Sequence, residues 1–391
     1  MTQNASPVLL PGSTIGIFGG GQLGRLTAIA ARTMGYRIHV LDPDPGCPAR
    51  FVVDQCVEAD WSDAHEAARL ARGCDVITLE IEQVSLASMN AAGAYAPVRP
   101  SESLLGVIQD RIEQKDWLRR NGFPLGDYRA VRSYEELRQA VHELSDKCFC
   151  KSATGGYDGR GQGKVGFNPA TAGTEEELRA AWKALCEGPG VVEKAIDLDR
   201  EISILVARSP LGEVKVYPAA WNHHENQILA WSVLPAPLSD AMARQARELA
   251  EGIANCFVLE GILAVEMFVS TDGKILVNEL APRPHNSYHS SERACVTSQF
   301  EQLVRAVCNL PLGDPSVVQP CAISNLLGDL WLGPDGRRTP HFDAALAVPG
   351  VRLHLYEKLR PRKGRKMGHL SAVAPTAEEA VQLVERAHSL L

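Results

Sequence analysis

The chain has 391 residues, which is enough for two or three domains of about 150 residues each. Hydrophobic residues make up 45% and charged residues 22%, as in ordinary folded proteins, which excludes disorder, collagen and coiled coil. The net charge of −7 provides no basic field for nucleic acid or an anionic membrane, so we expect neither as a partner.

The first hundred residues alternate between strand and helix patterns. Their apolar periodicity predicts strand 14–18, helix 22–34, strand 37–41, helix 64–71 and strand 75–79. This alternation is typical of a parallel, doubly wound sheet, so we expect a Rossmann-like α/β domain over residues 1–104.

A glycine motif, Gly19-x-Gly21-x-x-Gly24, lies between the first strand and the first helix, and Asp42 ends the second strand. This pattern favours a dinucleotide site, because the glycines admit a phosphate to the helix N-terminus and the acid can bind a ribose. The same pattern also fits a tight turn without a ligand. Because Gln22-Leu23-Gly24-Arg25 follows, it fits a different phosphorylated ligand as well.

The pattern changes after Pro100, where one charged helix is predicted over 104–121 and another over 134–144, among Gly-rich hairpins and strands. We expect a second domain over residues 105–310. From residue 311, prolines separate short strands and a helix is predicted over 377–390, which indicates a small α+β domain over 311–391.

A glycine-rich loop follows the strand that ends at Lys151, and extended structure resumes at Lys164. Its glycines expose backbone N–H groups to an anion, while Lys151 and Arg160 supply positive charge. No helix follows and the loop lacks the Walker pattern, so we expect residues 151–165 to cover phosphates as a flap between two strands. The alternative is a flexible hairpin tip.

Two glutamates are predicted to face each other across a hairpin. If Asp272 and Gly273 form a two-residue turn, Glu266 pairs with Glu279, with Asn278 adjacent. Opposed like charges destabilise a sheet unless a proton or a cation lies between them, and oxygen ligands suit Mg²⁺. The alternative is a pair of glutamates exposed on the solvent face.

The ten cysteines include no Cys-x-x-Cys pair, so we expect mostly buried free thiols. No uncharged apolar stretch approaches the roughly 18 residues that span a bilayer. The first basic residue is Arg25, so we expect a cytoplasmic protein without a signal peptide.

Taken together, these segments resemble the ATP-grasp superfamily in their order along the chain. Four motifs narrow the resemblance to the 5-(carboxyamino)imidazole ribonucleotide synthases of purine biosynthesis: Gly-Gly-Tyr-Asp-Gly-Arg-Gly-Gln (155–162), Asn-Glu-Leu-Ala-Pro-Arg-Pro-His-Asn-Ser (278–287), Thr-Ser-Gln-Phe-Glu-Gln (297–302) and Gly-Arg-Lys-Met-Gly-His (364–369). The resemblance implies an ATP-grasp domain over 105–310 and a homodimer. It also implies ATP-dependent carboxylation of 5-aminoimidazole ribonucleotide by bicarbonate, through carboxyphosphate.

The resemblance also implies site residues. Around ATP it places Arg111, Lys151, Gly156, Tyr157, Asp158, Gly159, Arg160, Gly161, Gln162, Glu193, Lys194, Ala195, Ile196, Glu201, His224, Asn278 and Glu279, with Mg²⁺ on Glu266 and Glu279. Asp158, Arg160 and Arg283 are the expected catalytic residues. The expected ribonucleotide and bicarbonate contacts are Gln22, Leu23, Tyr157, Asp158, Arg160, Arg283, His285 and Asn286.

For the 5′-phosphate of the ribonucleotide we select Lys358, Arg365 and Lys366, from a strongly basic stretch whose alternative role is a solvated surface. Two departures from the family pattern bear on the pocket. Glu80-Ile81-Glu82-Gln83-Val84 stands where Glu-Phe-Glu-Asn-Val is usual, and Tyr288 replaces a glycine, which we expect to narrow the cleft.

Other functions stay open at this point. A formate-dependent ribonucleotide transformylase or a biotin carboxylase would share the ATP-grasp features. An NAD(P)-dependent oxidoreductase is supported only by the segment from Gly19 to Asp42. A nucleotide sensor without catalysis would not need the metal-ligating glutamates.

Overall fold

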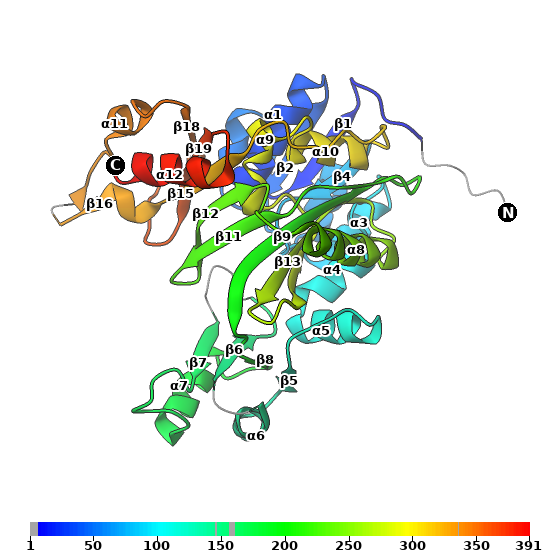
Figure 1. The fold of residues 1–391 in the computed structure, drawn as a ribbon. Coiled ribbons are helices and arrows are strands. Elements are labelled where there is room, and N and C mark those ends of the chain that lie inside the picture. The colour runs from blue at the N-terminus through cyan, green and yellow to red at the C-terminus, as the bar shows by residue number, and fades with distance from the viewer. Residues whose placement is uncertain (1–6, 145–146, 156–160, 335) are drawn as a thin grey trace.

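The computed structural model describes residues 7–144, 147–155, 161–334 and 336–391. Figure 1 shows a mixed α/β protein in which the first sheet and its helices lie at one end and a small four-stranded sheet lies at the other. A long curved sheet lies between them. No helix in the described ranges is long and apolar enough to cross a membrane.

The first sheet is parallel, in the order β3-β2-β1-β4. All five residues of β1 are buried, because helices cover the sheet. The elements are β1 (Thr14–Phe18), α1 (Gln22–Thr33), β2 (Arg37–Asp42), a 3₁₀ turn (Pro48–Phe51), β3 (Gln55–Glu58), α2 (Ala64–Ala71), β4 (Val76–Leu79) and α3 (Leu86–Gly93). The predicted doubly wound architecture is confirmed, and β3 and α3 are additional.

The single helix predicted over 104–121 is wrong. The chain forms α4 (Glu102–Gln109) and α5 (Arg111–Arg120), which are separated at Asp110. Asp110 has extended backbone angles, and its carboxylate accepts hydrogen bonds from the N–H groups of Ile112 and Glu113. An N-terminal cap of this kind starts a new helix, so Arg111 becomes the first residue of α5.

The small sheet has the order β5-β8-β6-β7. It is formed by β5 (Tyr128–Val131), β6 (Cys148–Ser152), β7 (Gln162–Val165) and β8 (Gly190–Lys194), with helices α6 (Tyr134–Leu144) and α7 (Glu175–Ala184). β6 and β7 are antiparallel neighbours, so the flap is the connection between two paired strands, as predicted.

The central sheet has the order β14-β13-β9-β11-β12-β15-β19-β18, with β10 paired to β9. It crosses residue 311 without a break, because β12 pairs with β15. Its strands are β9 (Leu198–Arg208), β10 (Val214–Val216), β11 (Ala220–Glu225), β12 (Ile228–Leu234), β13 (Gly261–Ser270), β14 (Ile275–Ala281), β15 (Cys321–Leu327), β18 (Val351–Leu355) and β19 (Lys366–Val373). The remaining helices are α8 (Asp240–Cys256), α9 (Ser291–Ala294), α10 (Gln299–Val307), α11 (Phe342–Leu346) and α12 (Ala377–His388), and a short β16 (Leu332–Gly333) pairs with β17 (Gly336–Arg337).

The core lies on both faces of this sheet. On β13, Leu263 and Val265 pack in one cluster with α8, while Ile262 and Ala264 pack in another with α10 and the first sheet. A strand buried on both faces appears in the sequence as a continuous apolar run, which is the pattern of residues 261–265.

The hairpin of β13 and β14 holds the predicted glutamate pair, but its turn differs from the prediction. The loop has three residues, 271–273, with Gly273 at φ 81°, and near it Val269 pairs with Ile275. A bulge then adds one residue, Asn278, to β14 and shifts the register so that Glu266 lies opposite Glu279. The pairing is confirmed, whereas the two-residue turn is wrong.

Candidate active site

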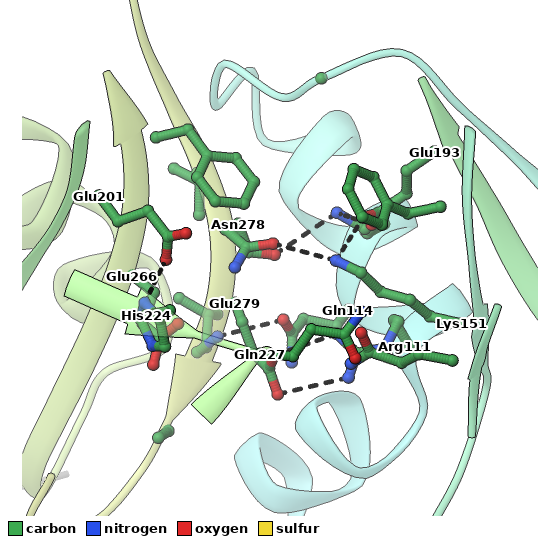
Figure 2. Close-up of a pocket in the computed structure, with 18 of the residues that line it drawn as sticks. Arg111, Gln114, Lys151, Glu193, Glu201, His224, Gln227, Glu266, Asn278 and Glu279 are labelled. Carbon is green, nitrogen blue, oxygen red and sulfur yellow. Dashed lines mark hydrogen bonds and ion pairs between the residues drawn. The ribbon is translucent and has the colours of Figure 1, made fainter. Parts of the chain in front are cut away.

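A cavity of about 710 Å³ lies between the small sheet and the central sheet. Its walls come from β6, β8, the start of α5, and strands β9, β11, β12, β13 and β14, as Figure 2 shows in part. Its lining includes residues 194–196 together with Arg283, His285, Asn286 and Lys366. One cavity therefore holds residues expected around ATP and residues expected at the ribonucleotide and bicarbonate.

A buried acid with two lysines forms one wall. Glu193 Oε1 lies 2.6 Å from Lys115 Nζ, and Glu193 Oε2 lies 2.5 Å from Lys151 Nζ. Burial alone would raise the pKa of Glu193, but the two ammonium groups hold it well below its usual range. The Nζ atoms of Lys115 and Lys151 also donate, at 3.4 Å each, to the main-chain oxygen and Oδ1 of Asn278.

Lys115 is a functional candidate that the sequence interpretation missed. It lies four residues after Arg111 on α5, and a spacing of four residues places both side chains on one face of the helix. Burial lowers the pKa of Lys115, although Glu193 counteracts this effect. The single helix predicted over 104–121 has the same spacing of Arg111 and Lys115, so this signal was already present in the sequence.

The opposed glutamates each contact a nitrogen atom from outside the hairpin. Arg111 Nη1 lies 3.1 Å from Glu279 Oε2, and His285 Nε2 lies 2.9 Å from Glu266 Oε1. Burial would raise the pKa of Glu266, but the hydrogen bond with His285 lowers it to about 2. Two paired carboxylates that line the cavity fit Mg²⁺, which usually takes one or two protein carboxylates together with phosphate oxygens and water.

Another cluster fits a metal less well. Glu292, His354 and His369 hold three possible ligand atoms within 4.8 Å of one another, the one such group found among the described residues. The His354 and His369 rings stack with centroids 4.5 Å apart and planes inclined by 9°. Because imidazole lone pairs lie in the ring plane, two stacked rings do not direct them to one ion.

The expected nucleotide contacts lie together at the cavity. Glu201 Oε2 is 2.9 Å from His224 Nδ1, and although burial lowers the pKa of His224, Glu201 raises it overall. Gln162 and the segment Lys194, Ala195 and Ile196 also line the cavity, with the Ala195 N–H donating to Lys147 O. Gly161, which precedes Gln162 in the chain, has a φ of 67°. The predicted residues Gly156, Tyr157, Asp158, Gly159 and Arg160 lie outside the described residues.

The N-terminal glycine turn binds acids of its own chain. The Gly20 N–H donates to Asp42 Oδ2 at 2.7 Å, and the N–H groups of Gly21 and Gly24 donate to the Glu80 carboxylate at 2.6 and 2.9 Å. Burial raises the pKa of Glu80 to about 7. These amides are the donors that would cradle a pyrophosphate, so the turn does not support a dinucleotide-dependent oxidoreductase.

Three of the residues expected at the ribonucleotide and bicarbonate, Arg283, His285 and Asn286, line the same cavity. Arg283 is buried, and its Nε lies 2.7 Å from Glu82 Oε1. Gln22 Nε2 donates to Asn286 Oδ1 at 3.5 Å. The Leu23 side chain packs against Leu26, Phe300 and Tyr356, so any contact of Leu23 with a substrate would use its backbone.

The basic segment divides into two parts. Lys366 is buried and lines the cavity. Lys358 Nζ donates to the Lys366 main-chain oxygen at 2.8 Å, and Arg365 Nη1 donates to Arg360 O at 2.8 Å. Of the three residues predicted to bind the 5′-phosphate, Lys366 is therefore the only one among the described residues that line the cavity. Lys358 lies next to Lys366 in space.

Tyr288 does not narrow the cleft, contrary to the prediction. Its ring is fully buried, and its hydroxyl lies 2.8 Å from the main-chain oxygens of Ser203 and Pro218 and accepts from the Leu205 N–H. The Tyr288 side chain therefore packs inside the protein, where its hydroxyl is hydrogen-bonded to the backbone of β9 in the central sheet. All ten cysteines are free thiols, and six of them are buried, as predicted.

This combination of a parallel N-terminal domain, a glycine-rich connection between the antiparallel strands β6 and β7, and an acidic hairpin is typical of an ATP-grasp ligase. Family models match at residues 13–109 (ribonucleotide synthetase preATP-grasp domain), 116–300 (ATP-grasp domain) and 321–383 (phosphoribosylaminoimidazole carboxylase C-terminal domain). The chain belongs to the N5-carboxyaminoimidazole ribonucleotide synthase family, which consists of ATP-dependent ligases of purine biosynthesis.

Similar proteins cover nearly the whole chain. N5-carboxyaminoimidazole ribonucleotide synthase of Brucella melitensis is 39% identical over 94% of this chain and 98% of its own length, and that of Bacillus subtilis is 37% identical over 96% and 95%. A crystal structure of an N5-carboxyaminoimidazole ribonucleotide synthetase with ADP has a TM-score of 0.89 at 38% identity and covers 99% of this chain and 98% of that one. The Aspergillus clavatus synthase, in complex with ADP and 5-aminoimidazole ribonucleotide, has a TM-score of 0.85 at 29% identity over 97% and 98%.

Proposed function

We propose that this chain carboxylates the exocyclic amine of 5-aminoimidazole ribonucleotide with bicarbonate, at the expense of ATP. The observation that carries the proposal is the continuous cavity. Its lining includes lysines and glutamates suited to a metal-bound triphosphate, and also Arg283 and Lys366, which are suited to two smaller anions. Related structures in complex with ADP, or with ADP and 5-aminoimidazole ribonucleotide, support the same pair of ligands.

At the nucleotide end, we assign Lys151 and Arg111 to the phosphates of ATP. Both side chains are buried, and both are paired with carboxylates that a phosphate can replace as the anionic partner. Glu266 and Glu279 would hold Mg²⁺, which would neutralise charge on the phosphates of ATP. We assign residues 194–196 to the adenine edge and Glu201 to the ribose, on the basis of their place along the cavity wall.

The first chemical step forms carboxyphosphate. A bicarbonate oxygen attacks the γ-phosphorus, the bond from phosphorus to the β,γ-bridging oxygen breaks, and ADP leaves with that electron pair. We assign Arg283 to hold bicarbonate, because its guanidinium is buried, fixed by Glu82 and suited to bidentate oxyanion binding. Catalysis of this kind rests on positioning and charge stabilisation, so no protein nucleophile is needed.

In the second step the exocyclic amine attacks the carboxyl carbon, either of carboxyphosphate or of CO₂ that it releases. Phosphate leaves with its oxygen, the amine loses a proton, and the carbamate remains. We assign Lys366 with Lys358 to the 5′-phosphate, and Gln22, His285 and Asn286 to the ribonucleotide. Arg365 is a less direct contact, because its side chain turns back to Arg360 O.

Several parts of the proposal rest on family expectation. They are the flap contacts of Tyr157, Asp158 and Arg160, the Mg²⁺ ion, a homodimer, a cytoplasmic location, and domain limits near residues 104 and 310. The bulged hairpin supports the magnesium prediction, because it opposes two carboxylates at the cavity edge.

The proposal is tested by ADP release from Mg-ATP. We expect release to require both bicarbonate and 5-aminoimidazole ribonucleotide, and to stop when formate replaces bicarbonate. Release with formate and a ribonucleotide would assign the chain to transformylation instead, and absence of ADP under every condition would refute catalysis.

A further inference from the structure

Two cysteines lie close together outside the cavity. The Sγ atoms of Cys47 and Cys56 are 3.8 Å apart, a contact between two thiols. Cys47 lies in the loop after β2 and is 1% exposed, whereas Cys56 lies on β3 and is half-buried. A disulfide needs about 2.05 Å between sulfurs, so the two atoms would have to approach by roughly 1.8 Å.

The surroundings allow this approach. β3 is the edge strand of the first sheet, paired only on one side, with Cys56 opposite Val40 of β2. Cys47 belongs to an irregular segment between Asp44 and the 3₁₀ turn. Both cysteines are therefore on chain segments that are held less firmly than the central strands β1 and β2.

The two thiols also differ in reactivity. The hydrogen bond from Cys47, with the nearby Arg50 cation, lowers the pKa of Cys56, although burial opposes this effect. The hydrogen bond with Cys56 and burial raise the pKa of Cys47. The pair therefore has one half-buried cysteine whose thiol is the more readily ionised, and one buried cysteine that can resolve an oxidised intermediate.

We propose that Cys47 and Cys56 form a redox-active dithiol that peroxides close to a disulfide. The Cys56 thiolate attacks a peroxide oxygen and breaks the O–O bond, which yields a sulfenic acid at Cys56 and hydroxide. Cys47 then attacks the Cys56 sulfur, the S–O bond breaks, and water leaves after proton transfer. The two sulfurs together lose two electrons, which the peroxide accepts.

The pair is linked to the glycine turn. A Cβ atom on Gly20 would lie 2.5 Å from Cys47 Sγ, so this sulfur packs directly against the turn backbone, and the Ala49 N–H donates to Gly20 O. Gln22, two residues later, reaches Asn286 at the cavity. Because disulfide formation draws Cys47 away from Gly20, we expect a three- to tenfold rise in the ribonucleotide KM and a change below twofold in the ATP KM. This kinetic effect rests on the proposed function, whereas disulfide formation does not.

Peptide mapping tests the chemistry directly. Trypsin cleaves after Arg50, which separates Cys47 in peptide 38–50 from Cys56 in peptide 51–69. After treatment with hydrogen peroxide and alkylation without reductant, we expect these two peptides as one cross-linked species that dithiothreitol separates. Peptides that stay separate, with Cys56 reduced or oxidised to sulfinic acid, would overturn the proposal.

Variants provide matched controls. Cys56→Ser should abolish the cross-linked species, whereas Cys74→Ser should retain it, because Cys74 is not part of the pair. Cys74 is a suitable control because it is also half-buried and burial raises its pKa to about 12. In the unoxidised protein, iodoacetamide at pH 7 should label Cys56 faster than Cys74, and equal or slower labelling of Cys56 would contradict its assignment as the attacking thiolate. If the disulfide forms and the ribonucleotide KM stays unchanged, the link to the glycine turn is refuted and the dithiol is retained.

Discussion

Replacing Lys115 by methionine removes one of the two ammonium groups around Glu193 and keeps the length of the side chain. Lys115 and Glu193 are both nearly buried, with 2.6 Å between Nζ and Oε1. Removing one partner from a buried ion pair typically costs about 3–5 kcal/mol. Because Lys151 still pairs with Glu193 at 2.5 Å, we expect the lower end, about 3 kcal/mol.

The same variant should weaken ATP binding. In the native chain, Lys151 can turn toward a phosphate while Lys115 still neutralises Glu193. In Lys115→Met, any movement of Lys151 leaves Glu193 buried without a cation. We therefore expect the ATP KM to rise by about tenfold, equivalent to about 1.4 kcal/mol, with the ribonucleotide KM changed much less.

Two assays check this prediction. Thermal unfolding without ligands should show a lower Tm, by roughly 5 °C or more, since 1 kcal/mol shifts Tm by about 2–4 °C in chains somewhat shorter than this one. Steady-state kinetics should show the rise in ATP KM. Lys115→Arg is the matched control, because it keeps the charge and should restore most of both values. An unchanged Tm and an unchanged ATP KM in Lys115→Met would refute the argument that Glu193 needs both lysines.

Three further predictions concern the opposed glutamates and the basic segment. Glu279→Gln should lower kcat at least tenfold and raise the Mg²⁺ concentration needed for half-maximal activity. The Tm should stay within a few degrees of the native value, because the substitution removes one of two opposed charges. Normal magnesium dependence would argue against Glu279 as a magnesium ligand. Glu266→Gln should lower the Tm at pH 7, measured without metal. The difference from the native Tm should shrink as the pH falls from about 4.5 toward 2. The reason is that the pKa of Glu266 is lowered to about 2 in the folded state, and the stabilisation by this carboxylate is lost as it is protonated. A difference that does not depend on pH would contradict the hydrogen bond between Glu266 and His285. Lys366→Ala should raise the ribonucleotide KM far more than the ATP KM, and equal changes would indicate a structural role.

The sequence could predict those features that depend on local pattern. Strand 14–18 and helices 64–71 and 134–144 match the structure residue for residue, because each has clear periodicity between turn signals. The pairing of Glu266 with Glu279 was also predicted, but only because two deviations from the assumed hairpin compensate. The loop has one residue more than assumed, and the bulge at Asn278 restores the register.

Contacts between distant segments could not be predicted in this way. Nothing local to residues 19–24 shows that Glu80, more than fifty residues later, takes the amides that a dinucleotide phosphate would need. The break between α4 and α5 depends on a single side chain, Asp110, which caps the second helix instead of continuing the first. Tyr288 was expected at the cleft because it replaces a glycine in a motif. Its hydroxyl instead forms hydrogen bonds with three backbone groups, of Ser203, Leu205 and Pro218.

The most direct test of the account is the fate of oxygen from bicarbonate. If bicarbonate attacks the γ-phosphorus in the cavity between Lys151 and Arg283, turnover with ¹⁸O-labelled bicarbonate must transfer one labelled oxygen to the phosphate product. We expect one ¹⁸O in each phosphate released, in equal amount with ADP and carbamate, when mass spectra are recorded before exchange with water. Phosphate without label, formed at the same rate as ADP, would mean that water attacks ATP and would contradict the carboxyphosphate route.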